Sequence, residues 1–373
     1  MSSFQSPPSL RNKKPPIQVK TSADKQSFLS KSVPMYLFLF TLIAFLTSSF
    51  LYFRHMTKSD SVDVITDLSE VHDPKVKVVR EKGQNLTNAL LFVEIESEQT
   101  LDPLKLKLSN YIAQKRQENA TRSVSVYVKD LNASMYLAIN SDSLYDPASL
   151  LKVPMLILYL KQVEKNPNLL SKSFVFKKNP QNKTVETITD KTLIDGKSYS
   201  VEQLLYYMIV YSDNEAFWIL CDNMDENIIT EFDKKLSIPS NIDITHFART
   251  DKHYITNVNS VAHYFNVLYN ASYIDNNMSN YALNLLCKTT FRAGILQGIP
   301  PKVIVAHKFG ERTLSYQIEG RVENLQSEFH EFGIVYLKNK PYIIGVMTRG
   351  QDSEKLQNVV ADISKIVYDE FSH

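Results

Sequence analysis

The stretch Asp146-Pro-Ala-Ser-Leu-Leu-Lys-Val-Pro-Met-Leu-Ile-Leu-Tyr-Leu160 decides how the rest of the chain is interpreted. From Leu150 onward it is apolar on nearly every face of a helix, which predicts a helix buried at the centre of a domain. Lys152 lies inside this run, and a buried ammonium group is costly unless something requires it. Ser149 precedes it by three residues, so both side chains lie on one face of the helix. A desolvated amine loses its charge readily, which makes Lys152 a candidate base for a Ser149 nucleophile.

The Ser-x-x-Lys spacing has little weight by itself. Ser22-Ala-Asp-Lys25 repeats it in a polar segment, which shows that chance matches occur. Only the apolar neighbours of Lys152 distinguish the later match from the earlier one. The position of Ser149 at the start of a helix adds a second argument, because its backbone N–H is then free to stabilise an oxyanion.

Two further short motifs follow along the chain. Tyr211-Ser-Asp-Asn214 lies at the start of a helical stretch that ends in Trp218 and Leu220, where serine, aspartate and asparagine are also ordinary helix caps. Lys308-Phe-Gly310 follows a predicted strand that ends at His307. A glycine there lets a substrate backbone approach the strand edge, and a lysine offers charge to an anionic substrate. Taken singly, each motif also fits a cap or a surface lysine.

The predicted elements around these motifs place the domain in the α/β (α+β) class. The order of the elements predicts an antiparallel sheet flanked by the terminal helices, plus an all-helical subdomain, with a cleft between the two. The predicted elements are a helix over 102–117, strands over 123–128 and 135–139, the buried helix over 150–160, helices over 201–221, 259–270 and 279–286, strands over 303–307, 333–337 and 342–348, and a final helix over 353–371.

The three motifs in this order resemble the signature set of the penicillin-recognising serine hydrolases. The chain is most similar to the class A β-lactamase-related branch of that family. Two later stretches agree, His330-Glu-Phe-Gly-Ile-Val335 and Pro341-Tyr-Ile-Ile-Gly-Val-Met-Thr348. The resemblance covers residues 86–373 and implies a β-lactamase/transpeptidase-like fold.

The resemblance also implies catalytic roles for the matching residues. Ser149 corresponds to the acylated nucleophile and Lys152 to its general base. Ser212 would relay a proton to the leaving nitrogen, while Asn214 would bind the substrate's amide carbonyl and orient Lys152. Asp213 is expected to hold the turn.

The third motif supplies the substrate-binding side of the implied site. Lys308 would direct positive potential toward the substrate carboxylate and Ser212. Gly310 would keep the strand edge open, and the backbone N–H groups of Ser149 and Glu311 would form the oxyanion hole.

Two departures from the family pattern bear on the substrate and on turnover. The third motif usually has a threonine or serine at its middle position, where this chain has Phe309; Thr313 or Ser315 could supply the hydroxyl instead. Class A enzymes hydrolyse the acyl-enzyme with a glutamate of an Ω-loop, but residues 242–258 contain none. Asp251 is the available substitute, so the sequence leaves deacylation open.

The N-terminal part of the chain has a different composition. Residues 1–33 are basic, interrupted by prolines and without apolar period, which predicts a disordered tail. The uncharged residues 34–53 are long enough as a helix, at about 1.5 Å per residue, to cross a bilayer. The basic flank predicts a cytoplasmic N-terminus and an extracytoplasmic domain at the cell membrane. A cleaved signal peptide would need a much shorter charged region. Residues 54–85 are interpreted as a stalk.

Composition excludes several other classes of protein. The 373 residues include 42 basic and 40 acidic side chains, for a net charge of +2. Six basic residues and one acid in the tail account for +5, which leaves −3 elsewhere and no case for nucleic acid. The eight histidines show no metal-ligand spacing, so neither a metal nor a cofactor is predicted. Cys221 and Cys287 are predicted to be buried thiols, with a disulfide between them left open.

The sequence therefore predicts a membrane-anchored, β-lactamase-like serine hydrolase that acts through an acyl-enzyme. Its expected partners are β-lactam or peptidoglycan-type amide substrates and the membrane. A cell-wall D,D-peptidase-like enzyme and a non-turnover penicillin-binding sensor or pseudoenzyme remain as alternatives.

Overall fold

A computed structural model describes the folded part of the chain. The predicted tail and transmembrane helix, residues 1–33 and 34–53, lie outside the described residues, as do residues 233–254. None of the helices within the described ranges combines the length and apolar content that crossing a membrane requires. The described residues are 76–80, 86–87, 90–95, 101–133, 135–178, 188–189, 191–225, 227–229, 232, 255–318 and 321–372.

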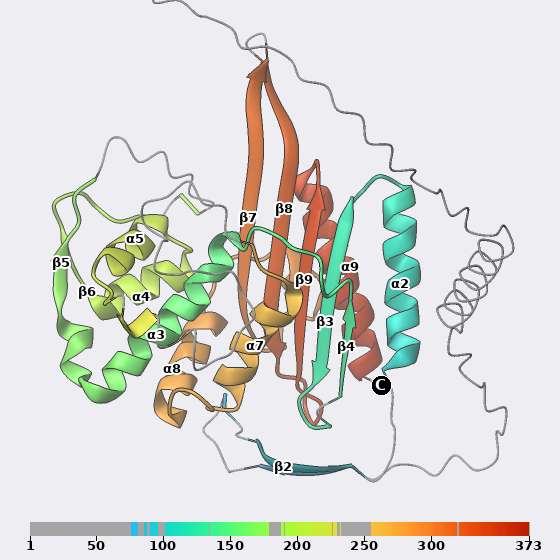
Figure 1. The fold of residues 1–373 in the computed structure, drawn as a ribbon, viewed down its shortest axis with the longest axis horizontal. Coiled ribbons are helices and arrows are strands. Elements are labelled where there is room, and N and C mark those ends of the chain that lie inside the picture. The colour runs from blue at the N-terminus through green and yellow to red at the C-terminus, as the bar shows by residue number, and fades with distance from the viewer. Residues whose placement is uncertain are drawn as a thin grey trace, which may run out of the picture. The chain divides into compact units, whose positions relative to one another are not determined.

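A five-stranded antiparallel sheet in the order β4-β3-β9-β8-β7 forms the framework (Figure 1). Side chains along the inner strands alternate between the two faces, so a core forms on each side of the sheet. On β3, for example, Val126 belongs to one core and Tyr127 to the other. The strands are β3 (Ser123–Asp130), β4 (Tyr136–Ile139), β7 (Val305–Ile318), β8 (Arg321–Val335) and β9 (Tyr342–Gly350).

Two terminal helices cover one face of the sheet. α2 (Asp102–Gln117) and α9 (Ser353–Ser372) lie side by side there (Figure 1). Leu104 and Leu108 of α2 and Val360 and Ile363 of α9 are buried in the core that these helices share with the sheet. The short turn η4 (Gly294–Gly298) packs against α9 on the same side.

The opposite face carries the helical subdomain, built around the helix that the sequence predicts as central. That helix, α3 (Lys152–Lys165), is buried at every position from Lys152 to Leu160. α7 (Val258–Tyr269) packs directly on β9. The other elements of this side are η1 (Ala148–Leu151), η2 (Pro167–Ser171), β5 (Ser173–Val175), β6 (Ser198–Ser200), α4 (Val201–Val210), α5 (Asn214–Asp222), α7 (Val258–Tyr269) and α8 (Asn276–Cys287). The predicted fold class is thereby confirmed.

The predicted single helical stretch 201–221 is wrong in one respect, because it is two helices. α4 begins with a capping box between Ser200 and Gln203, and it ends at Val210. Ser212 then has a φ of 57°, which no helix can contain, and Asp213 caps the start of α5. The interruption places a buried polar turn, Ser212 and Asp213, between two apolar helices.

The predicted strand ends in the third motif's region are also wrong. β7 continues without a break through Lys308–Gly310, and β8 begins at Arg321 rather than at residue 333. Polar residues dominate these extensions, so apolar periodicity does not reveal them. β8 pairs with β9 only from Ser327 onward, so the far half of the β7–β8 hairpin projects beyond the sheet (Figure 1).

The segment that precedes α2 contains a hairpin that the sequence did not predict. β1 (Val76–Arg80), inside the predicted stalk, pairs antiparallel with β2 (Leu90–Ile95). Between them, the Leu86 N–H donates to Asn280 Oδ1 at 3.2 Å and the Leu86 carbonyl accepts the Tyr336 hydroxyl at 3.0 Å. These two hydrogen bonds attach the segment before α2 to the rest of the domain at Leu86.

Candidate functional site

Ser149 lies in a strained turn at the edge of the helical subdomain. It belongs to η1, directly before α3. The preceding residue, Ala148, has a φ of 47°, in the left-handed region that costs a non-glycine residue about 1 kcal/mol or more. The Asp146 carboxylate supports this conformation by accepting the Ala148 N–H at 2.9 Å. The turn therefore holds Ser149 in one orientation at the start of a buried helix.

The Lys152 amine is the centre of the site. Its side chain is buried, and its Nζ lies 3.0 Å from Ser149 Oγ and 2.7 Å from Asn214 Oδ1. The Ser212 carbonyl and hydroxyl oxygens lie 2.5 and 3.2 Å from the same Nζ. These oxygens fix the direction of the amine, so a neutral Lys152 would point its lone pair or an N–H at Ser149.

The Ser212 hydroxyl lies between two lysines. Its Oγ accepts from Lys308 Nζ at 2.8 Å as well as from Lys152 Nζ. Since both lysines donate to this oxygen, the hydroxyl hydrogen is free to point toward a third acceptor. The strained φ of Ser212 keeps it at this position, where it can pass a proton.

Lys308 is completely buried in the middle of β7. Its Nζ donates to Ser212 Oγ and to the Phe309 carbonyl at 2.9 Å. Burial, followed by the neighbouring charge of Lys152, holds the pKa of Lys308 well below its usual value, while Glu331 opposes the shift. Two amines that share one hydroxyl thus disfavour each other's protonated form.

Gly310 allows β7 to approach the Ser149 turn. A Cβ at this position would lie 2.8 Å from the Pro147 carbonyl oxygen and 3.2 Å from the Ser149 nitrogen. These are backbone atoms, so no side-chain rotation could relieve the overlap. The Glu311 side chain lies on the other face of β7, where its carboxylate accepts the Ser353 hydroxyl at the start of α9. Only the backbone of Glu311 is therefore available to the site.

Asp213 has the structural role that the sequence predicts. Its Oδ1 accepts the Ala216 N–H at 2.7 Å and caps α5. Burial raises the pKa of this carboxyl above its usual value, which opposes the effect of its hydrogen bonds. The cap starts α5 at Asn214, whose side chain thereby faces Lys152.

The middle residue of the third motif supplies no hydroxyl to the site, although its carbonyl accepts from Lys308 Nζ and its ring centroid lies 4.2 Å from that amine. The Phe309 ring is buried on the α9 side of β7, where it stacks on Phe291 with ring centroids 3.9 Å apart. Thr313 lies on that same side and its hydroxyl lies 3.2 Å from the Ser327 hydroxyl, so it does not replace the missing group. The Ser315 side chain lies outside the described residues.

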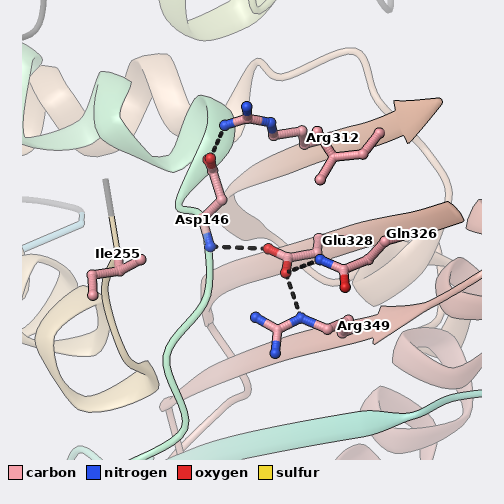
Figure 2. Close-up of a pocket in the computed structure, with 7 residues that line it drawn as sticks. Asp146, Ile255, Arg312, Gln326, Glu328 and Arg349 are labelled. Carbon is pink, nitrogen blue, oxygen red and sulfur yellow. Dashed lines mark hydrogen bonds and ion pairs between the residues drawn. The ribbon is translucent and has the colours of Figure 1, made fainter. Parts of the chain in front are cut away.

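A polar network that the sequence did not predict holds the loop before Ser149 (Figure 2). The Asp146 N–H donates to Glu328 Oε2 at 2.9 Å, and Asp146 Oδ2 pairs with Arg312. His330 Nε2 donates to the Asp146 carbonyl at 2.9 Å, because its Nδ1 already accepts the Thr348 N–H. The signal available in the sequence was two ionisable residues, 328 and 330, at alternate positions of one strand.

Glu328 is the buried anion of this network. Burial alone would raise its pKa, but the hydrogen bonds from His330 and Arg349 and the charge of Arg349 lower it below the usual value. The Arg349 Nε donates to Glu328 Oε1 at 2.6 Å. Burial also lowers the pKa of His330, in agreement with the neutral form that its two hydrogen bonds require.

The segment expected to supply a deacylating base is not part of the described structure. Asp251 and residues 242–254 lie outside the described residues. The chain resumes at Ile255, and Thr256 forms a two-way backbone bridge with Tyr145 at 2.8 Å. Thr256 thus lies beside the loop that leads to Ser149.

The sequence also led to predictions about the state of the two cysteines and about metal binding. Cys221 and Cys287 are free thiols and half-buried, so no disulfide joins them. Burial raises the pKa of both thiols, that of Cys287 to about 12. Within the residues described, no three metal-ligating side chains lie together.

Comparisons with known proteins point to one family. A family model described as the beta-lactamase enzyme family matches residues 103–371. Similar solved structures include TLA-1 extended-spectrum beta-lactamase, 20% identical with a TM-score of 0.60, over 74% of this chain and 100% of that one. A beta-lactamase from Chitinophaga pinensis DSM 2588 is 20% identical with a TM-score of 0.59, over 72% and 99%. A PBP-A mutant in acyl-enzyme complex with penicillin G is 18% identical with a TM-score of 0.58, over 74% and 98%. No curated protein matches the chain by sequence.

Proposed function

This chain belongs to the beta-lactamase enzyme family, and from that premise we propose that it forms an acyl-enzyme at Ser149 with β-lactam or related amide substrates. The observation that carries the proposal is the convergence of Ser149, Asn214 and Ser212 on one buried amine, with Lys152 Nζ 3.0 Å from Ser149 Oγ. A lysine buried at this depth would be destabilising without such a use.

The proposed acylation uses the geometry in three steps. Neutral Lys152 takes the Ser149 proton as Oγ attacks the amide carbonyl carbon. The backbone N–H groups of Ser149 and Glu311 then stabilise the oxyanion, at the place where Gly310 lets β7 approach. Ser212 gives its proton to the leaving nitrogen as the C–N bond breaks. It recovers that proton through the lysine amines that bind its oxygen.

Deacylation separates a turnover enzyme from the second candidate function. A class A β-lactamase would hydrolyse the acyl-enzyme rapidly with a glutamate that residues 242–258 lack. This absence favours a slowly deacylating D,D-peptidase-like enzyme or a penicillin-binding sensor as the alternative. Phe309 favours it too, since the hydroxyl that would hold a β-lactam carboxylate is replaced by a core aromatic.

The test is a time course of intact mass with benzylpenicillin, using the full chain in detergent. A transient adduct with product release supports a β-lactamase, whereas a lasting adduct supports the peptidase or sensor. An adduct that persists in Ser149→Ala would contradict the nucleophile, and no adduct in the wild type would contradict both functions.

The proposal extends to location. Residues 34–53 would cross the cell membrane once, with the N-terminus in the cytoplasm and residues 86–373 outside. The support is the uncharged run with its basic N-terminal flank. Protease added to intact cells should digest the domain and leave the tail; protection of the domain would contradict this orientation.

A further inference from the structure

A small cavity lies beside the Ser149 turn, at the point where β7 passes Asp146 (Figure 2). Its volume is about 170 Å³, enough for a few non-hydrogen atoms of a substrate. The residues that line it combine four charged groups, one amide and two aliphatic side chains: Asp146, Ile255, Arg312, Leu314, Gln326, Glu328 and Arg349. No step of the acylation described above uses this cavity.

The charged side chains that line the cavity differ in how much of their hydrogen-bonding capacity is still unused. Both Asp146 oxygens accept hydrogen bonds, from the Ala148 N–H and from Arg312. Both Glu328 oxygens are also occupied, by Arg349 and by the Asp146 N–H. Arg349 donates to Glu328 and, at 2.6 Å, to the Leu144 carbonyl, and it lies over the Tyr145 ring.

Arg312 is the charged group that remains available. In the described part of the chain its guanidinium contacts a single carboxylate oxygen, that of Asp146. A guanidinium has five N–H donors, so most of its binding capacity is unused there. Its side chain is 37% exposed, compared with 6% for Glu328. The cavity therefore favours a ligand group that accepts hydrogen bonds and carries negative charge.

The position of Arg312 along β7 indicates which half of a bound substrate it would contact. Lys308, Gly310 and Arg312 alternate on the face of β7 that meets the helical subdomain, about 6.6 Å apart at roughly 3.3 Å per residue. Gly310 lies against the Ser149 nitrogen. Lys308, on one side, reaches the Ser212 hydroxyl that would protonate the leaving nitrogen. Arg312, on the other side, therefore faces the acyl half of a substrate that lies along this edge.

We propose that Arg312 and this cavity form a subsite for a carboxylate on the acyl half of the substrate. The natural substrate would then be an amide whose acyl portion is acidic, such as a peptide with a free side-chain carboxylate. Leu314, 40% exposed, offers an apolar wall for the carbons that bear that group. The inference rests on the proposed acyl-enzyme function and adds a substrate class to it.

The experiment compares two probes that differ by one carboxylate on the acyl side chain, benzylpenicillin and its α-carboxy derivative carbenicillin. Acylation of the full chain is followed by intact mass for the wild type, Arg312→Gln and Arg312→Lys. Arg312→Gln should lower the carbenicillin-to-benzylpenicillin rate ratio by about tenfold, and Arg312→Lys by less, since it keeps the charge but loses the planar fork. Lys338→Gln, which removes an exposed charge elsewhere, should leave the ratio unchanged.

A second measurement keeps this test separate from the acylation proposal. The affinities of both probes are measured for Ser149→Ala, which cannot form the adduct, and for Ser149→Ala with Arg312→Gln. A carbenicillin preference that Arg312→Gln abolishes supports the subsite even if the wild type forms no adduct. Equal losses for both probes would overturn it, because Arg312 would then only hold Asp146. An unchanged ratio would overturn it as well.

Discussion

The two faces of β7 serve different purposes within the five residues from Lys308 to Arg312. Lys308, Gly310 and Arg312 face the helical subdomain, where they meet Ser212, the Ser149 turn and Asp146. The intervening residues Phe309 and Glu311 face α9 and take part in packing and a structural hydrogen bond. Alternation of side chains along one strand therefore separates the groups that would perform chemistry from the groups that hold the strand in place.

The α9 face has its own buried polar cluster. Glu331 Oε1 lies 2.7 Å from His307 Nδ1, and Oε2 accepts the Ile295 N–H at 2.6 Å. Gly294 leaves room for this carboxylate, since a Cβ there would lie 2.1 Å from Oε2. Every oxygen of Glu331 is satisfied, whereas the amines on the other face are held close together. The α9 face should therefore contribute stability and the site face should reduce it.

The largest effect is expected on the site face. Lys152→Met removes the proposed base, so acylation should fall by about 1,000-fold or more, equivalent to about 4 kcal/mol. The rate of adduct formation measures it at a temperature where both proteins are folded. Lys161→Met, on the same helix but half-buried and paired with Glu164, is the matched control and should acylate normally. Equal acylation rates in the wild type and Lys152→Met would show that this amine is not the base.

The next effect should appear on the α9 face and in stability alone. Glu331→Ala leaves the Ile295 N–H and His307 without their buried partner, which should lower the free energy of unfolding by about 3 kcal/mol. Urea unfolding measures the loss, and the acylation rate of the folded variant should change little. A variant of normal stability that fails to acylate would break the division between the two faces.

A third effect tests the close approach of β7 to the turn. Gly310→Ala places a Cβ against the Pro147 carbonyl and should displace the strand, which lowers acylation about 100-fold, or about 2.7 kcal/mol. Gly350→Ala is the comparison, because its Cβ would meet the movable end of Leu356 at 3.0 Å. If both substitutions reduce acylation equally, the approach of Gly310 has no special role.

The smallest effect is a pH dependence of stability that originates from Lys308. With its pKa lowered by burial, the folded chain binds fewer protons than the unfolded chain from the folded-state pKa up to about 10.4. The free energy of unfolding should therefore rise with pH across that window. Lys308→Met should be about 1 kcal/mol more stable than the wild type at pH 7, and this advantage should shrink toward pH 10. Urea midpoints from pH 7 to 10 measure it, and a constant difference would contradict the argument.

The sequence predicted the parts of the fold and site that local patterns encode. The apolar run around Lys152 predicted a central helix because burial on every face leaves no alternative. It could not predict the pairing of Asp146 with Arg312, since 166 residues separate them and only the folded sheet brings them together. The polar extensions of β7 and β8 were missed because apolar alternation is absent there.

The missed break at Ser212 has a different cause. The apolar pattern continues across residues 201–221, but Asp213 competes for the backbone by capping α5 and thereby ends one helix and starts another. The motif residues could still be identified, because their spacing in the sequence does not depend on where each helix or strand begins and ends.

In the proposed mechanism Ser149 is the nucleophile and Lys152 activates it. The most direct test maps the benzylpenicillin adduct by fragmenting the tryptic peptide of residues 130–152, which contains Ser149. We expect a single adduct on Ser149, absent from Ser149→Ala and formed much more slowly in Lys152→Met. An adduct on another residue, or one that forms at the same rate without Lys152, would contradict it.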